Sequence, residues 1–279
     1  MKEAKQFFEF VLERERIRNL RENGCRRPWT QDPVLNEYRF CNVFREDDRT
    51  TRYFRETVRD MMQDNPLVLM ATIGWRWFNR ITTCGSIKWW TMYGWDRELA
   101  ERDLRPIQKS GVPLVTGAYL IKTPGGVDKL TGILDCMDVV KEQELDIRTE
   151  ICHRSLEHAH ERLMQIPYLG RFMAYEIVTD LRHTYLLRTA EDIMTWASAG
   201  PGCCRGASWV RDGFPGSISY GTKRGQESAL NVMRELLKMS HYEWDYLREW
   251  EMREVEHCLC EYDKYRRAQE GQRLKRKYA

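Results

Sequence analysis

A short turn between two amphipathic runs constrains the fold of this chain more than any other stretch. Apolar residues at helical spacing lead to the sequence IPYLGR at residues 166–171, and a second helical pattern begins at Met173. Proline ends the first run and glycine permits a tight turn, so the spacing predicts a helix, a hairpin and a helix across residues 156–181. Free N–H groups in such a turn can bind a phosphate without reading base sequence. The hairpin residues predicted to contact a DNA backbone are Tyr168, Gly170 and Arg171.

Carboxylates and a glycine-rich segment follow the hairpin. Asp180 lies near the end of the second run, and Asp192 comes after it. Residues 200–206 read GPGCCRG, which predicts a glycine-rich turn. We expect Gly202 and Arg205 of that turn to extend the contact with DNA.

A DNA-gripping hairpin followed by a carboxylate is the layout of helix-hairpin-helix base-excision glycosylases, and this segment resembles them. It departs from their pattern at two positions, because Tyr168 replaces the first of two glycines and Phe172 replaces the lyase lysine. Strand cleavage through a lysine is therefore not expected. The alternative for Asp180 is a structural carboxylate near a helix end, satisfied by Arg182 or His183.

Composition limits how such a chain could meet DNA. Its 45 Lys and Arg against 42 Asp and Glu leave a net charge of only +3, so a nucleic-acid surface must come from local clustering. A hydrophobic content of 42% supports a sizeable core. We expect one helical domain over residues 1–268 and a basic tail at 269–279 that adds non-specific attraction to phosphates. Scattered cysteines and the lack of a membrane-length apolar run favour a reducing cytoplasm and no membrane partner.

Arginines cluster in the first part of the chain. Arg45, Arg49 and Arg52 lie three or four positions apart, so a helix would place them on one face as a fork array suited to an oligophosphate. Asp47 and Asp48 interleave with them, and a salt-bridged surface is the alternative.

A second cluster follows the apolar run at residues 67–73. Arg76, Asn79 and Arg80 lie there among aromatic residues. Amide and guanidinium groups beside stacking rings could read a flipped base along its Watson–Crick edge. The alternative is a helix end packed with large side chains.

Titratable groups also concentrate near the C-terminus. Glu256, His257, Cys260 and Glu261 fall within about one and a half helical turns, so several of them could reach one cleft. Another group of Cys and His residues precedes the hairpin, but it lacks a second pair at zinc spacing, and no metal is expected there. Its members are Cys152, His153, His158 and His160.

Residues 28–35, 39–49, 75–80 and 256–265 together resemble the phage alpha-glutamyl/putrescinyl thymine pyrophosphorylases, which include amino acid:DNA transferases. The chain is also similar to the helical domain of 5-hydroxymethyluracil DNA kinases. The resemblance implies an all-α, helix-hairpin-helix glycosylase-like fold. No G-x-x-x-x-G-K-[ST] phosphate-binding loop occurs, so we expect the helical unit without a kinase domain.

The resemblance implies a transferase that acts on double-stranded DNA and makes a hypermodified thymine. An amino acid or a polyamine would replace the pyrophosphate of a 5-pyrophosphorylmethyl-uracil that base flipping brings out of the stack, without a cofactor. Arginine side chains would stabilise the departing pyrophosphate. The residues implied for binding the substrate and its pyrophosphate are Asn42, Arg45, Asp48, Arg49, Arg52, Arg76, Asn79, Arg80, Glu256 and Glu261.

The transfer also needs a proton acceptor, because the attacking amine must be neutral. The likeness to glycosylases favours Asp180, with Asp192, Glu176 and His257 as alternatives. The same carboxylate could instead stabilise the electron-poor methylene that remains if pyrophosphate departs first.

Two other functions fit the same sequence. A DNA glycosylase would share the fold and base flipping, whereas a non-enzymatic DNA-binding protein would recruit a separate hydroxymethyluracil DNA kinase. The transferase is the leading hypothesis. Its expected partners are double-stranded DNA containing modified uracil and an amino acid or polyamine donor, in the cytoplasm of an infected host cell if the chain is phage-encoded.

Overall fold

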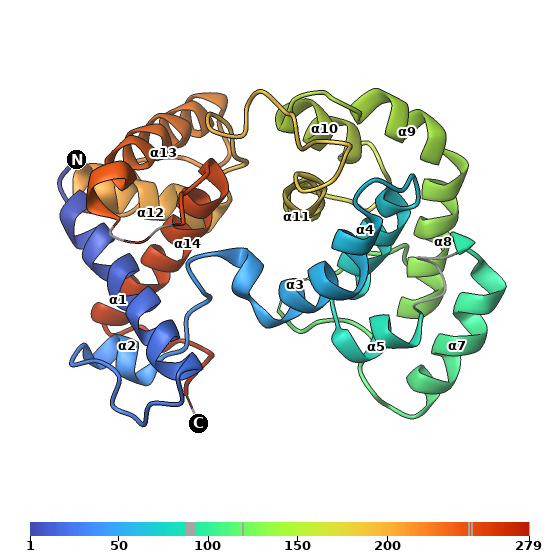
Figure 1. The fold of residues 1–279 in the computed structure, drawn as a ribbon, viewed down its shortest axis with the longest axis horizontal. Helices are drawn as coiled ribbons and strands as arrows, with labels where there is room; N and C mark the ends of the chain where they lie inside the picture. The colour runs from blue at the N-terminus through green and yellow to red at the C-terminus, as the bar shows by residue number, and fades with distance from the viewer. Residues whose placement is uncertain (88–92, 119, 245, 247, 279) are drawn as a thin grey trace. The chain divides into compact units, whose positions relative to one another are not determined.

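The chain forms two compact units in the computed structural model (Figure 1). Unit 1 combines Met1–Asp48 with Ile193–Ala279, and unit 2 is Arg49–Asp192. The structure describes residues 1–87, 93–118, 120–244, 246 and 248–278. These ranges hold helices, turns and irregular segments, with one isolated β-bridge between Tyr38 and Lys277, so the predicted all-α class is confirmed. The single domain expected from the sequence stays a prediction. No helix in the described ranges is long and apolar enough to cross a membrane.

Capping residues and a proline fix where two helices of unit 1 begin. The Asp32 carboxylate accepts the Leu35 N–H, and Pro33 occupies the first turn, where its missing N–H has no cost. Glu251 and Glu254 form a reciprocal capping box at the start of the last helix. The helical elements of unit 1 are α1 (Ala4–Glu22), α2 (Pro33–Glu37), the short turn η1 (Arg45–Asp47), α12 (Pro201–Asp212), α13 (Lys223–Glu243) and α14 (Met252–Gln269).

Glycines let α12 approach α14 closely. A Cβ added at Gly206 would lie only 2.1 Å from the Leu259 carbonyl oxygen. One added at Gly202 would lie 2.6 Å from the Cys260 sulfur. Side chains at these two positions would therefore separate the helices.

The glycine-rich turn predicted at residues 200–206 is wrong, because most of this segment is the first part of α12. Gly200 is the N-cap and Pro201 is the first helical residue, a position that proline favours. Proline and glycine usually mark a turn, but here they mark a helix start and a close helix contact.

Unit 2 is built around a buried helix, α4 (Val68–Phe78), in which every residue is buried. It packs against α11 (Arg171–Leu181). The remaining named elements of unit 2 are α3 (Arg49–Phe54), the turns η2 (Arg55–Arg59) and η3 (Asp60–Met62), α5 (Ile81–Ser86), α7 (Arg97–Lys109), α8 (Lys129–Glu142), α9 (Glu144–Ile151) and α10 (Leu156–Leu163).

The helix, turn and helix predicted at residues 156–181 are present as α10, a connecting turn and α11. In the turn, the Leu169 N–H donates to the Ile166 carbonyl at 3.1 Å, and Gly170 is the N-cap of α11. Tyr168 has a φ of 64°, in the left-handed region that glycine adopts most easily. A glycine at this position in related hairpins would have the same backbone conformation without strain. The likeness to glycosylase hairpins stays a prediction.

We expect Gly206→Ala to destabilise the protein by about 1–3 kcal/mol, because the new methyl group would overlap the Leu259 carbonyl and push α12 away from α14. Urea unfolding followed by tryptophan fluorescence would measure the loss. Gly221→Ala is the matched control, since its Cβ would meet nothing within 4 Å. Superimposable unfolding curves for the two variants would contradict the close helix contact.

Candidate functional site

Two segments far apart in the sequence meet in unit 1 and form a largely buried polar cluster. His257 Nε2 lies 3.1 Å from the Asn42 carbonyl oxygen, 215 positions away in the chain. The Cys41 N–H donates to the Glu261 carboxylate at 3.2 Å. This group is called the α14 cluster below. Its members are Arg14, Cys41, Asn42, Arg45, Asp48, His257, Glu261 and Lys264.

The backbone of Asn42 organises this cluster. Its N–H donates to Asp48 Oδ1 at 3.1 Å. Its carbonyl oxygen accepts a hydrogen bond from Arg14 Nη2 at 3.1 Å and also contacts His257 Nε2. The Asn42 amide side chain, predicted to contact substrate, donates to the Asp47 carbonyl at 2.8 Å. Asn42 therefore holds the loop in shape rather than presenting its amide outward.

The titratable residues of α14 are divided between two faces, although the sequence predicted that they could share one cleft. Glu256 and Cys260 face α12, where the Glu256 carboxylate accepts the Gly200 N–H at 3.4 Å. His257 and Glu261 contact the loop of the α14 cluster instead. Each helical residue turns the side-chain direction by about 100°, so neighbours in sequence serve different surroundings.

Charges in the α14 cluster fix the protonation of its central groups. Burial is the largest influence on Glu261 and by itself would raise its pKa, but the surrounding positive groups, with Lys264 first among them, together outweigh burial and lower the pKa to about 2. Burial opposes the charge on Lys264, yet the Glu261 carboxylate raises the Lys264 pKa. Burial and then the Arg45 guanidinium hold the pKa of His257 well below its ordinary value. The cluster thus contains a neutral imidazole beside an ionised carboxylate and several cations.

Three groups with lone pairs converge in this cluster. The Cys41 sulfur, an Asp48 oxygen and a His257 ring nitrogen lie within 4.8 Å of one another. Burial, and then the nearby Glu261, raise the pKa of the Cys41 thiol. Burial also raises the pKa of Asp48, although Arg45 opposes the shift. The sequence predicted no metal site and did not indicate this convergence, because residue spacing within one segment cannot reveal a contact between distant segments.

The arginine array predicted at residues 45–52 does not form on one continuous helix. Arg45 begins η1, whereas Arg49 and Arg52 lie in α3. Between them Asp48 is extended, with φ −67° and ψ 134°, and the boundary between the units follows it. The spacing was helical, but the chain leaves the helical conformation at Asp48.

Asp180 and Glu176, two candidates for the general base, lie in a buried ion cluster of unit 2. Arg76 donates to both Asp180 oxygens, at 2.5 and 2.8 Å, and lies 3.1 Å from Glu176. All three side chains are at most 3% exposed. The sequence also suggested Arg182 or His183 as structural partners of Asp180, and the structure shows Arg76 of α4 as its ion-pair partner. The general-base role of Asp180 or Glu176 stays a prediction.

Other predicted site residues have structural roles in the described regions. Asn79, expected to read a base, ends α4 in a left-handed conformation with φ 42°. Arg80 donates to the Thr82 hydroxyl at 3.2 Å. Arg205, expected to contact DNA, pairs with Asp263 of α14 at 2.9 Å, beside the close glycine contact.

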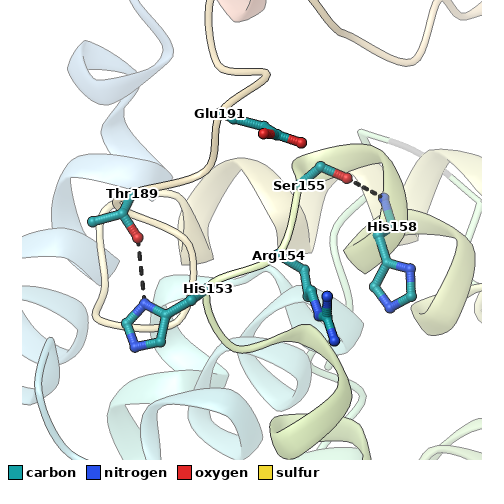
Figure 2. A pocket seen from close by; sticks show the side chains of 6 residues that line it. All are labelled: His153, Arg154, Ser155, His158, Thr189 and Glu191. Atoms are coloured by element: carbon teal, nitrogen blue, oxygen red, sulfur yellow. Dashed lines mark hydrogen bonds between the residues drawn. The ribbon is translucent and has the colours of Figure 1, made fainter.

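Asp192, a further base candidate, caps α10. Its carboxylate accepts the N–H groups of Leu156 at 2.6 Å and Glu157 at 3.0 Å. A pocket of about 390 Å³ lies beside this helix start, where the Ser155 hydroxyl also accepts the His158 N–H (Figure 2). None of the predicted site residues lines it. The pocket is lined by His153, Arg154, Ser155, His158, Thr189 and Glu191.

The contribution of His257 to the free energy of unfolding should fall as the pH drops below about 6.5, because His257 stays neutral when folded and takes up a proton when unfolded. The depressed pKa means that this contribution is lost at up to about 1.4 kcal/mol per pH unit below pH 6.5. Glu254, whose pKa burial raises to about 7, has the opposite pH dependence and is unchanged by the variants below. Denaturant unfolding between about pH 5 and pH 7 would show less loss of stability on acidification for His257→Gln than for the wild type.

The exposed His241→Gln variant is the control and should keep the wild-type slope. His160 of unit 2, whose pKa burial lowers to about 4, contributes in the same direction and is unchanged in both variants. Equal slopes for His257→Gln and the wild type would contradict a neutral buried His257.

Asp180→Asn should destabilise the protein by about 2–3 kcal/mol, because the buried Arg76 would lose two hydrogen bonds to an ionised carboxylate while it keeps its ion pair with Glu176. Asp64→Asn is the matched control. Asp64 pairs with Arg188 at 2.7 Å, and the two side chains are 60% and 49% exposed, so the loss should be below about 1 kcal/mol. Chemical unfolding would compare the two, and equal losses would argue against a structural ion cluster.

Comparison with known proteins identifies the family. Residues 2–274 match the family model described as 5-hmdU DNA kinase, helical domain. The chain is 27% identical over 286 residues to the 5-hmdU DNA kinase of Bacillus phage SP10, an alignment that covers 93% of this chain and 44% of that protein. The chain therefore spans less than half the length of this relative, and no solved structure matches it significantly. This chain belongs to the family of 5-hmdU DNA kinase helical domains.

Proposed function

We propose that this protein acts in the hypermodification of thymine in phage DNA, as a transferase that replaces the pyrophosphate of a 5-pyrophosphorylmethyl-uracil with an amino acid or a polyamine. The observation that carries the proposal is the meeting of residues 41–48 with α14 in one polar cluster. Both segments contribute to the sequence resemblance. Their convergence supports the α14 cluster as the reaction site.

The charges of the cluster suit a pyrophosphate leaving group, which gains negative charge as it departs. Arg14, Arg45 and Lys264 contribute cations, and Glu261 holds Lys264 in place. The Lys264 side chain is 40% exposed, so it can meet an anion that approaches from solvent. Fixed guanidinium and ammonium groups need little rearrangement at the moment of reaction, which favours catalysis over binding alone.

The transfer also needs a lone pair that can take the proton of the attacking amine or assist the leaving group. Of the four candidates predicted from the sequence, His257 is the member that lies in the cluster, and its low pKa keeps the imidazole neutral. Asp180, Glu176 and Asp192 are engaged in unit 2. We therefore place the reactive groups in unit 1.

The hairpin of unit 2 is the proposed contact with the DNA backbone. No side chain caps the start of α11 at Gly170, so its first N–H groups can bind a phosphate. Tyr168 and Phe172 are 46% and 49% exposed beside this turn, and the exposed Arg171 adds positive charge. Exposed aromatic rings next to a phosphate site suit an unstacked base.

A second candidate function is that of a non-enzymatic DNA-binding partner for a hydroxymethyluracil DNA kinase. The specific support is that the alignment with the phage kinase covers only 44% of that protein, so the matched part need not carry its kinase activity. Tight DNA binding without any chemical change would favour this function.

We expect the purified protein to convert DNA containing pyrophosphorylated hydroxymethyluracil when supplied with a mixture of amino acids and polyamines. Digestion to nucleosides and mass spectrometry would detect a heavier nucleoside, with pyrophosphate released. Arg45→Ala should slow the transfer at least about 100-fold, because one cation at the leaving group is lost. The exposed helical Arg224→Ala is the control and should transfer at the wild-type rate.

An unchanged rate for a folded Arg45→Ala variant would show that the pyrophosphate site lies elsewhere. Unmodified DNA with tight binding would support the partner function, and abasic sites in the product DNA would identify a glycosylase instead.

A further inference from the structure

We propose that unit 1 binds a divalent transition-metal ion, zinc in the first instance, through Cys41, Asp48 and His257. The three donor atoms lie within 4.8 Å of one another, and ligands about 2.0–2.3 Å from one zinc ion lie about 3.3–3.8 Å apart, so small side-chain movements would bring all three into contact with one ion. The donors come from a loop and a helix that are joined by hydrogen bonds.

Hydrogen bonds orient each ligand, as partners of metal ligands usually do. A carbonyl oxygen can only accept, so the Asn42 carbonyl places the proton of His257 on Nε2 and leaves the lone pair on Nδ1. The Asn42 N–H holds one Asp48 oxygen at 3.1 Å, which leaves the second oxygen for a metal. The Cys41 N–H is held by Glu261.

The donor types select among metals. A sulfur and an imidazole nitrogen favour zinc or another first-row transition metal over magnesium, which prefers oxygen ligands. A divalent cation bound between the Cys41 sulfur and the Asp48 carboxylate would take both as anionic ligands, because zinc binds the thiolate form of cysteine.

Three protein ligands leave a coordination position open, the arrangement of catalytic rather than structural zinc sites. This part of the inference rests on the proposed function. With Arg14, Arg45 and Lys264 nearby, an oxygen of the pyrophosphate is the ligand that the open position would take. The metal then uses the lone pair of His257, and the proton of the attacking amine would pass instead to an oxygen of the departing pyrophosphate, which gains negative charge as its bond to the methylene breaks.

The test is metal binding by the full chain, read without any activity measurement. Chelator-treated protein would be loaded with zinc, separated from free ion by gel filtration and analysed for metal content. We expect about one zinc per chain for the wild type and for the exposed Cys25→Ser control, and loss of the ion from Cys41→Ser. Cobalt loading should give a thiolate-to-cobalt charge-transfer band that Cys41→Ser lacks and Cys25→Ser keeps.

Asp48→Asn is the second variant, because its amide oxygen can still accept the Asn42 N–H and preserve the loop. It should fold, as judged by circular dichroism, and bind zinc at least about 10-fold more weakly. Folded wild-type protein that retains no zinc, or a cobalt spectrum unchanged by Cys41→Ser, would overturn the site.

The outcomes separate this inference from the proposed function. Zinc that is retained through Cys41, without transfer of an amino acid or polyamine to the DNA, would support the metal site and contradict the proposed transferase activity. Transfer at full rate by demonstrably metal-free protein would support the transferase and exclude the metal from its mechanism, so that His257 would again be the proton acceptor.

Discussion

The close approach of α12 to α14 is the constraint on which unit 1 depends. Gly206 leaves no room for a side chain against the Leu259 carbonyl, so the distance between the two helices is set by backbone atoms. Backbone contact also fixes the rotation of α14, because Gly202 and Gly206 meet it at defined residues. A helix whose position is fixed in this way can bury polar side chains on several faces, provided that each of them finds a hydrogen-bond or ion-pair partner.

The rotation of α14 decides which side chains meet which partners. Positions 256, 260 and 263 face α12, where Asp263 pairs with Arg205. Positions 257, 261 and 264, spaced four and three apart, face the loop of the α14 cluster. Glu46 of that loop adds a buried ion pair to Arg253 at 2.9 Å, which ties the loop to the helix start. A rotation of one residue would replace the neutral His257 with the carboxylate of Glu256 and reverse the chemistry of the cluster.

Sequence periodicity predicted some of the helices but not their partners. The helices and turn at residues 156–181 follow from apolar spacing and turn residues, which act within a few positions. The prediction for residues 200–206 was wrong because glycine and proline are found both in turns and where a helix begins or packs closely against another. The sequence of this segment alone does not distinguish the two, whereas its contact with α14 does. The spacing of Arg45 and Arg49 predicted one continuous helix, but the backbone at Asp48 is extended. The Asp48 carboxylate accepts the Asn42 N–H, which stabilises the loop at this point. The α14 cluster itself joins residues 215 positions apart, a distance at which periodicity carries no information.

The α14 cluster and the ion cluster around Arg76 differ in a way that separates stabilisation of the fold from chemistry. In unit 2, Arg76 faces two carboxylates and all three side chains are sealed from solvent, so the group is closed to a ligand. In unit 1, Lys264 is 40% exposed, while Cys41 and Asp48 are only partly buried and have raised pKa values. In a closed ion cluster, each charge stabilises the fold by compensating a partner that would otherwise be buried alone. In a partly open cluster, a ligand from solvent can still bind to the charged groups and lower their electrostatic free energy. This access to a ligand, rather than the number of charged residues, favours the α14 cluster as the functional site.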